Sequence, residues 1–283
     1  MTVHTQANTT SSEPVVVCVA PNGARRTQKD HPRLPITPEE IALEALACVQ
    51  AGATVLHLHV RDDDGRHSLD PRRYQAAMDA IDRKVGGELI IQITTEAVGI
   101  YEPSQQIDVV KSLCPQAASV ALRELIPNED FLSRAANFFD WSKRQGIALQ
   151  FILYTPEEAR QLNSLVESGI IGIEKPNSLF VLGRYSADQQ SASMDLLAFL
   201  SDWPQDWPWS VCAFGLSEAM CMAAAIGLGG HVRVGFENNL HLPDGTLANG
   251  TSDLAGIVQD LAGSVGRGTA SLGQAKRIYG LRN

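Results

Sequence analysis

Two histidines one residue apart, His57 and His59, lie inside the apolar run of residues 55–60. A β-strand alternates its side chains between two faces, so both imidazoles are expected on one side and Leu58 on the other. Two polar rings on one face of a buried strand cost free energy unless something satisfies them. Such a pair of histidines typically binds a metal ion. Core histidines that are hydrogen-bonded to their neighbours are the alternative.

Glu237 offers a carboxylate to the same kind of site. It directly follows the apolar run of residues 232–236, in which Arg233 alternates onto the same face as Glu237. Buried charges at such positions need a partner or a metal. Two histidines and one carboxylate are a common ligand set for a catalytic Zn²⁺ that keeps a coordination position open. Because non-haem iron(II) uses the same set, the ligands alone do not select the metal.

These side chains must be positioned by a repeating pattern of strands and helices. The expected strands are residues 15–19, 55–60, 89–94, 119–122, 148–154, 178–182, 209–214 and 232–236. Helix signals follow them at residues 37–50, 70–87, 103–113, 131–145, 155–169, 194–200, 217–226 and 254–265, with a last helix at 274–279. The clearest signals are the Thr-Pro-Glu-Glu segments at 37–40 and 155–158, which combine an N-cap, a first-turn proline and first-turn acids.

The alternation of strands and helices predicts an α/β fold with a parallel sheet. Eight such units in 283 residues, without a shift in composition, predict a single-domain (β/α)8 TIM barrel. The runner-up is an open doubly wound sheet, which usually carries a glycine-rich phosphate turn after its first strand. Residues 20–26 match neither GxGxxG nor the Walker pattern, which favours the barrel.

In a barrel, the active site lies at the C-terminal ends of the strands. The polar residues expected at these ends are Asn22, Arg25, His57, His59, Arg61, Thr94, Thr95, Glu96, Arg123, Glu124, Tyr154, Arg184, Arg233, Glu237, Asn238 and Asn239. A charged residue at a strand end is most often solvated, so the clustering of this set around the two histidines is what favours a functional site.

Composition excludes several other classes of protein. The chain is 44% hydrophobic and has a net charge of −9 with no basic run, which argues against a nucleic-acid partner. No apolar segment is long enough to span a bilayer. Residues 1–13 are polar and lack the features of a secretory signal, so we expect a flexible segment ahead of a catalytic domain at 14–283. The five cysteines are scattered without CxxC, which predicts a reducing, cytoplasmic location.

Four segments together give the chain a resemblance to a known family. They are residues 57–66 (HLHVRDDDGR), 91–95 (IQITT), 180–183 (FVLG) and 229–239 (GGHVRVGFENN). From about Val15 onward, the chain resembles the β-keto acid cleavage enzymes, which include the 3-keto-5-aminohexanoate cleavage enzymes. The resemblance implies a zinc-containing barrel that forms a homo-oligomer. It also implies a reaction of a β-keto acid with acetyl-CoA that gives acetoacetate and a new acyl-CoA.

The resemblance assigns roles to individual residues. It implies that Zn²⁺ is held by His57, His59 and Glu237, and that the hydroxyl of Thr94 helps to hold the substrate. Arg233 matches the arginine of an Arg–Asp dyad that deprotonates the substrate, but Asn238 stands where the dyad has its aspartate. Either Arg233 acts without that partner, or another carboxylate, Glu124 or Glu96, serves as the base. Asn22, Thr95 and Asn238 are expected to contact the substrate.

Arg25 bears on the choice of substrate. The resemblance implies an acid at this position in enzymes that take an amino-substituted substrate, so an arginine reverses the preference. With Arg123 expected nearby, we predict a β-keto acid that carries a second anionic group, because guanidinium groups favour carboxylates. The alternative is that Arg25 pairs with Glu124 and contacts no substrate. Two rival functions stay open, a CoA-independent metal-dependent aldolase or hydrolase on a TIM barrel and a non-enzymatic, metal-stabilised barrel.

Overall fold

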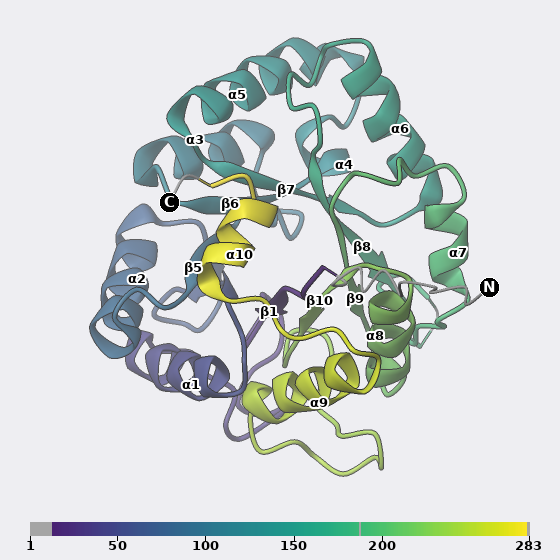
Figure 1. Cartoon of the computed structure of the whole chain (residues 1–283). Coiled ribbons are helices and arrows are strands. Elements are labelled where there is room, and N and C mark those ends of the chain that lie inside the picture. The colour runs from purple at the N-terminus through teal and green to yellow at the C-terminus, as the bar shows by residue number, and fades with distance from the viewer. Residues whose placement is uncertain (1–12, 187, 282–283) are drawn as a thin grey trace, which may run out of the picture.

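The computed structural model describes residues 13–186 and 188–281. Its parallel strands close into a barrel in the order β1, β10, β9, β8, β7, β6, β5, β2, and helices surround the barrel (Figure 1). The strands are β1 (Val17–Val19), β2 (Val55–Leu58), β5 (Ile90–Thr94), β6 (Ala117–Ala121), β7 (Ala148–Leu153), β8 (Asn177–Leu182), β9 (Trp209–Ala213) and β10 (His231–Val234). The predicted single-domain (β/α)8 barrel is confirmed. The predicted flexible segment 1–13 lies outside the described residues, apart from Glu13.

The helices form the outer layer. They are α1 (Pro38–Gln50), α2 (Pro71–Val85), α3 (Pro103–Leu113), α4 (Leu122–Leu125), α5 (Leu132–Gln145), α6 (Pro156–Glu167), α7 (Asp195–Leu200), α8 (Glu218–Gly227), α9 (Thr251–Ser264) and α10 (Leu272–Ile278), with a 3₁₀ turn at Glu129–Phe131. Thr37 is the N-cap of α1, as predicted, and its side chain and that of Glu40 form a capping box. Within the described chain, no helix has the length and apolar character that crossing a membrane requires.

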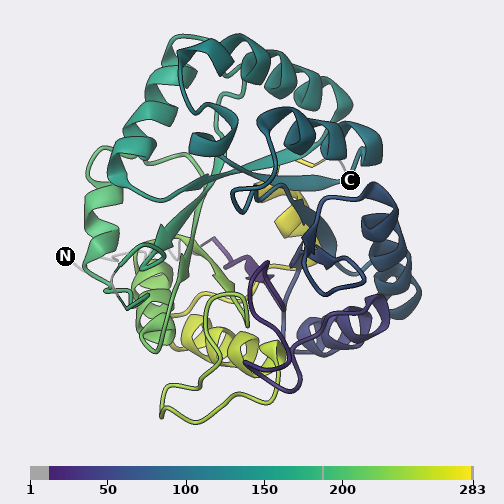
Figure 2. The same ribbon diagram turned by 180° about the vertical axis from the view of Figure 1, so that it is seen from behind.

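Alternation along β2 sets the direction of the site residues. Leu56 and Leu58 belong to the main apolar core between barrel and helices, so His57 points to the barrel interior. At the end of the barrel where the strands begin, α10 crosses the opening (Figure 1), and it lies behind the strands in the opposite view (Figure 2). Its Ala275 and, just beyond it, Tyr279 pack with residues near the strand starts, such as Val55. The barrel is therefore covered at this end, and the candidate site lies at the other.

Two strands, β2 and β10, end two residues earlier than predicted. β2 stops at Leu58, because the next residues form β3 (Val60–Arg61), which pairs antiparallel with β4 (His67–Ser68) in a separate hairpin. β10 stops at Val234, because Gly235 adopts a φ of +139°. A Cβ on Gly235 would lie 2.4 Å from the carbonyl oxygen of Ala20, so only glycine fits this turn. Glu237 thus lies in a turn beyond the strand.

Candidate active site

The three predicted metal ligands converge at the C-terminal end of the barrel. The Nε2 atoms of His57 and His59 are 3.1 Å apart. Oε2 of Glu237 lies 3.5 Å from Nε2 of His57 and 3.3 Å from Nε2 of His59. Ligand atoms on a tetrahedral Zn²⁺ with bonds of about 2.1 Å are separated by roughly 3.4 Å. The triad therefore has the spacing that one small divalent cation requires.

The hydrogen bonds of His57 prepare its Nε2 for a metal. Nδ1 of His57 lies 2.8 Å from Oε1 of Gln92, and Nε2 of Gln92 donates to Gln150 across 3.2 Å. Because the amide oxygen of Gln92 faces the imidazole, Nδ1 carries the proton and Nε2 keeps a free lone pair. Burial, reinforced by the charge of Arg233, lowers the pKa of His57 to about 3. The ring is therefore neutral at physiological pH, as a metal ligand must be.

Glu237 is held on two sides. Nη2 of Arg233 donates to Oε1 of Glu237 across 3.0 Å, while no described group donates a hydrogen bond to the buried Oε2. Burial opposes ionisation of this carboxyl, but Arg233 and the two histidines hold its pKa well below the ordinary value. Gly23 packs against the same side chain with a φ of +65°, and a Cβ there would lie 2.5 Å from Cγ of Glu237. Oε2, which faces only the two imidazole nitrogens, is the atom that a cation would satisfy.

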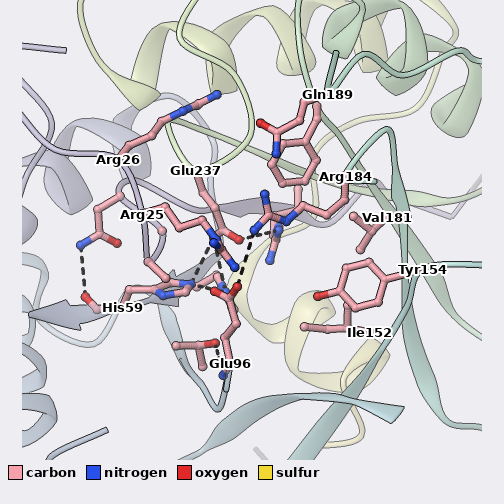
Figure 3. A pocket seen from close by; sticks show the side chains of 17 residues that line it. Arg25, Arg26, His59, Glu96, Ile152, Tyr154, Val181, Arg184, Gln189 and Glu237 are labelled. Atoms are coloured by element: carbon pink, nitrogen blue, oxygen red, sulfur yellow. Dashed lines mark hydrogen bonds and ion pairs between the residues drawn. The ribbon is translucent and has the colours of Figure 1, made fainter. Parts of the chain in front are cut away.

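A cavity of about 100 Å³ opens in front of the triad (Figure 3). Ile152, Val181 and Phe214 form an apolar wall, contributed by β7, β8 and the end of β9. The charged residues that line the cavity are Arg25, Arg26, Arg184, Arg233, Glu96 and Glu237. Four guanidinium groups against two carboxylates favour a small anionic ligand.

These four guanidinium groups differ in how many hydrogen bonds and ion pairs they already make within the protein. Arg233 is bonded to Glu237. Arg26 donates to two backbone carbonyls, that of Phe236 at 2.5 Å and that of Asn238 at 3.3 Å. Arg184 lies 3.9 Å from Glu96, a loose ion pair. Arg25 is exposed and has no hydrogen bond or ion pair with any described residue. Arg25 and Arg184 are therefore the cations most available to a ligand.

Ten of the polar residues expected at the strand ends line this cavity: Asn22, Arg25, His57, His59, Thr94, Glu96, Tyr154, Arg184, Arg233 and Glu237. The hydroxyl of Thr94 accepts a hydrogen bond from the backbone nitrogen of Glu96 across 3.0 Å. Nδ2 of Asn22 donates to the carbonyl of His59 across 3.1 Å. Thr94 thus also holds the backbone at Glu96, and Asn22 holds the backbone at His59.

Arg123 and Glu124 do not line the cavity, contrary to expectation. The chain turns into the short helix α4 directly after β6, which directs Arg123 to an ion pair with Glu158 and to the ring of Tyr154, 4.7 Å away. Glu124 accepts hydrogen bonds from the backbone nitrogen of Ala97 (3.0 Å) and from Gln106 (2.7 Å). No pair between Arg25 and Glu124 is found in the described chain.

Thr95 and Asn238 also lie away from the cavity. The hydroxyl of Thr95 donates to the carbonyl of Ser119 across 2.9 Å and joins two strands. The side chain of Asn238 is fully buried, and its amide atoms have no partner among the described residues. Neither residue is among the described residues that line the cavity.

Several residues of the site were missed by reasoning from the sequence, namely Gln92, Arg26, Gln189 and the wall residues Ile152, Val181 and Phe214. A signal for Gln92 exists: it alternates onto the face of Thr94, and in the parallel pairing of β2 with β5 it lies beside His57. Arg26 carries no comparable signal, since its contacts are with distant backbone carbonyls.

Comparisons with known proteins agree with this geometry. The chain matches the family model of the beta-keto acid cleavage enzymes over residues 14–281. A 3-keto-5-aminohexanoate cleavage enzyme of Fusobacterium nucleatum is 31% identical over 277 residues, covering 95% of this chain and 99% of the relative. A 3-oxoadipate:acetyl-CoA acetyltransferase of Cupriavidus necator is 28% identical over 284 residues, covering 95% and 96%. The solved structure of apo ObcA has a TM-score of 0.71 at 19% identity and covers 88% of this chain and 66% of ObcA, which shows the shared fold. The chain belongs to the beta-keto acid cleavage enzyme family.

Proposed function

We propose that this protein transfers a two-carbon unit of a β-keto acid to the acetyl group of acetyl-CoA. In R–CO–CH₂–COO⁻, the bond between C2 and C3 breaks and C2 forms a new bond to the acetyl carbonyl carbon. The CoA thiolate moves from the acetyl group to the R–CO fragment, so the products are acetoacetate and R–CO–CoA. The triad of His57, His59 and Glu237 in front of a cation-lined cavity is the observation that carries this proposal.

The bound metal is proposed to be zinc, which accepts two histidines and a carboxylate and leaves a position for substrate. Such a metal supplies Lewis-acid polarisation of the substrate ketone and stabilises the negative charge that develops on its oxygen. Gln92 fixes the orientation of His57, and Arg233 fixes that of Glu237. These two residues keep the ligand atoms at the spacing that the metal requires.

We assign removal of the C2 proton to Glu96. Besides Glu237, it is the one carboxylate that lines the cavity in the described chain. The competing base, Glu124, is engaged with Ala97 and Gln106 outside the cavity. Arg233 keeps its proton, since the pKa of its guanidinium is raised despite burial. In this proposal, a carboxylate in the loop after β5 takes the place of the dyad aspartate that is missing at Asn238.

The substrate is proposed to carry a second anionic group, because Arg25 and Arg184 bring positive charge to the cavity in front of the triad (Figure 3). The acetyltransferase of Cupriavidus necator, which is named for 3-oxoadipate, supports a dicarboxylate. The test is a panel of 3-oxoadipate, 3-oxohexanoate and 5-amino-3-oxohexanoate with acetyl-CoA, for wild type and Arg25→Glu.

Wild type is expected to prefer 3-oxoadipate, and Arg25→Glu to lose about 10- to 100-fold in kcat/KM for it, as for one charged hydrogen bond. Arg134→Glu, a reversal of charge in α5, is the control. Faster turnover of the neutral or the cationic acid by wild type would contradict the assignment of the substrate.

A cytoplasmic location and a homo-oligomeric state are proposed as well. The five cysteines are free, and all but Cys114 are buried, which supports a reducing compartment. The oligomeric state is supported by the family resemblance. Sedimentation velocity of the purified protein would test it, and a monomer at micromolar concentration would contradict it.

A further inference from the structure

A second groove, of about 360 Å³, adjoins the active-site cavity. It lies between the loop after β1, the β3–β4 hairpin and the loop after β5, and it shares Ala24 and Arg25 with the cavity. The larger cavity at the opposite end of the barrel, beside Tyr279, shares no lining residue with the active site among the described residues. Of these two, only the groove next to Arg25 can deliver a long molecule to the metal.

The groove carries positive charge. Arg25, Arg61 and Arg66 line it, against the single carboxylate of Asp64. Arg61 is buried, and its guanidinium group already donates hydrogen bonds to backbone carbonyls, such as that of Gly23 at 2.5 Å. Arg66 is 73% exposed and pairs with Asp64, itself 65% exposed, across 2.7 Å. Since exposed pairs of this kind contribute little stability, Arg66 can exchange Asp64 for a phosphate at small cost.

The opposite edge of the groove is apolar and rigidly held. Ile100 is 66% exposed, and Val98 adopts a φ of +45°, a strained conformation for a β-branched residue. The loop is closed by a hydrogen bond from Ile100 to the carbonyl of Ala97 (2.9 Å). Glu124 anchors it through the nitrogen of Ala97. An isoleucine held out in this way offers a preformed apolar contact next to two exposed guanidinium groups.

We propose that this groove binds the CoA portion of acetyl-CoA, with the pantetheine chain against Val98 and Ile100 and the phosphates on Arg66, while Arg25, at the boundary with the cavity, stays available to the keto acid. The inference rests on the proposed function, which requires an acetyl thioester at the metal. The cavity of about 100 Å³ leaves no room for the nucleotide, so this part must lie outside. The groove matches the chemistry of CoA. The exposed guanidinium group of Arg66 suits the phosphates, and the exposed aliphatic side chains suit the apolar pantetheine chain. Glu124 is a positioning residue in this arrangement.

The test compares acetyl-CoA with acetyl-pantetheine, which lacks the phosphates. Arg66→Glu is expected to raise KM for acetyl-CoA about tenfold at low salt, an effect that shrinks as salt screens the contact. The same variant should leave KM for acetyl-pantetheine unchanged. Asp64→Asn frees Arg66 and should lower KM for acetyl-CoA, whereas Ile100→Asp should raise KM for both thioesters.

The matched control is Arg144→Glu, because Arg144 is also exposed and also pairs with an aspartate, Asp140. It lies in the last turn of α5, at the end of the barrel away from the site. An unchanged KM for acetyl-CoA in Arg66→Glu, with an active wild type, would overturn the groove assignment alone. A wild type that forms no acyl-CoA from any keto acid would instead overturn the proposed function.

Discussion

His231, at the start of β10, makes the stability of the barrel depend on pH. The side chain is buried, and its Nδ1 accepts a hydrogen bond from the backbone nitrogen of Val16 across 3.2 Å. Burial, reinforced by the charge of Arg267, lowers the pKa of His231 from 6.5 to about 3. Between these two pH values the unfolded chain binds a proton that the folded chain does not. The contribution of neutral His231 to the free energy of unfolding is therefore complete above pH 6.5 and is lost as the pH falls towards 3.

The size of this effect follows from the two pKa values. At pH 5 the unfolded state gains about 2 kcal/mol from protonating one such histidine, and at pH 7.5 it gains roughly 0.1 kcal/mol. The variant His231→Asn removes the titration, and its amide oxygen keeps an acceptor for the nitrogen of Val16. The pKa values of His57 and His67 are also lowered to about 3. Their contributions to the pH dependence of the free energy of unfolding are the same in wild type and variant, so they cancel in the comparison.

The assay is urea unfolding at pH 7.5 and pH 5, followed by tryptophan fluorescence in the presence of a chelator. Wild type should lose about 2 kcal/mol more than His231→Asn between the two pH values. Equal losses in the two proteins would mean that buried His231 accepts a proton without cost, contrary to this prediction.

Three further changes test the site. Gln92→Leu removes the partner of His57 Nδ1 and should weaken zinc binding about ten- to hundredfold in a competition titration; unchanged affinity would show that Gln92 does not orient the ligand. Glu96→Gln should lower kcat by roughly 10² to 10⁴ with KM for acetyl-CoA unchanged, and near-normal kcat would exclude Glu96 as the base. Gly23→Ala places a Cβ 2.5 Å from Cγ of Glu237 and should lose metal, whereas Gly86→Ala, with a similar φ of +62° and no neighbour within 4 Å, should lose only stability. Equal metal content in these two glycine variants would contradict the packing argument.

The repeating units of the barrel can be predicted from sequence because each carries its own signals. Apolar β-branched runs and N-cap prolines are local features, and the closed barrel follows from their number. The ends of strands are less predictable, because tertiary contacts decide them. Residues 55–60 form one apolar run, yet Val60 and Arg61 pair with His67 and Ser68 in a hairpin. Sequence spacing does not encode that pairing.

The same distinction applies to the site. His57, His59 and Glu237 are predictable because buried polar residues in apolar runs stand out. The predicted position of Arg123 at the cavity is wrong, because a four-residue helix after β6 directs its side chain to Glu158. The use of Glu124 as a loop anchor depends on Ala97, 27 residues away, and no local pattern reveals it.

The destination of the acetyl group distinguishes transfer to the keto acid from simple hydrolysis of acetyl-CoA. The zinc-loaded protein is incubated with 3-oxoadipate and acetyl-CoA labelled with ¹³C at the acetyl carbonyl, and the products are identified by NMR. We expect acetoacetate labelled at C3, together with an equal amount of an unlabelled acyl-CoA. Label recovered in acetate or left in acetyl-CoA, with no new acyl-CoA, would contradict this expectation.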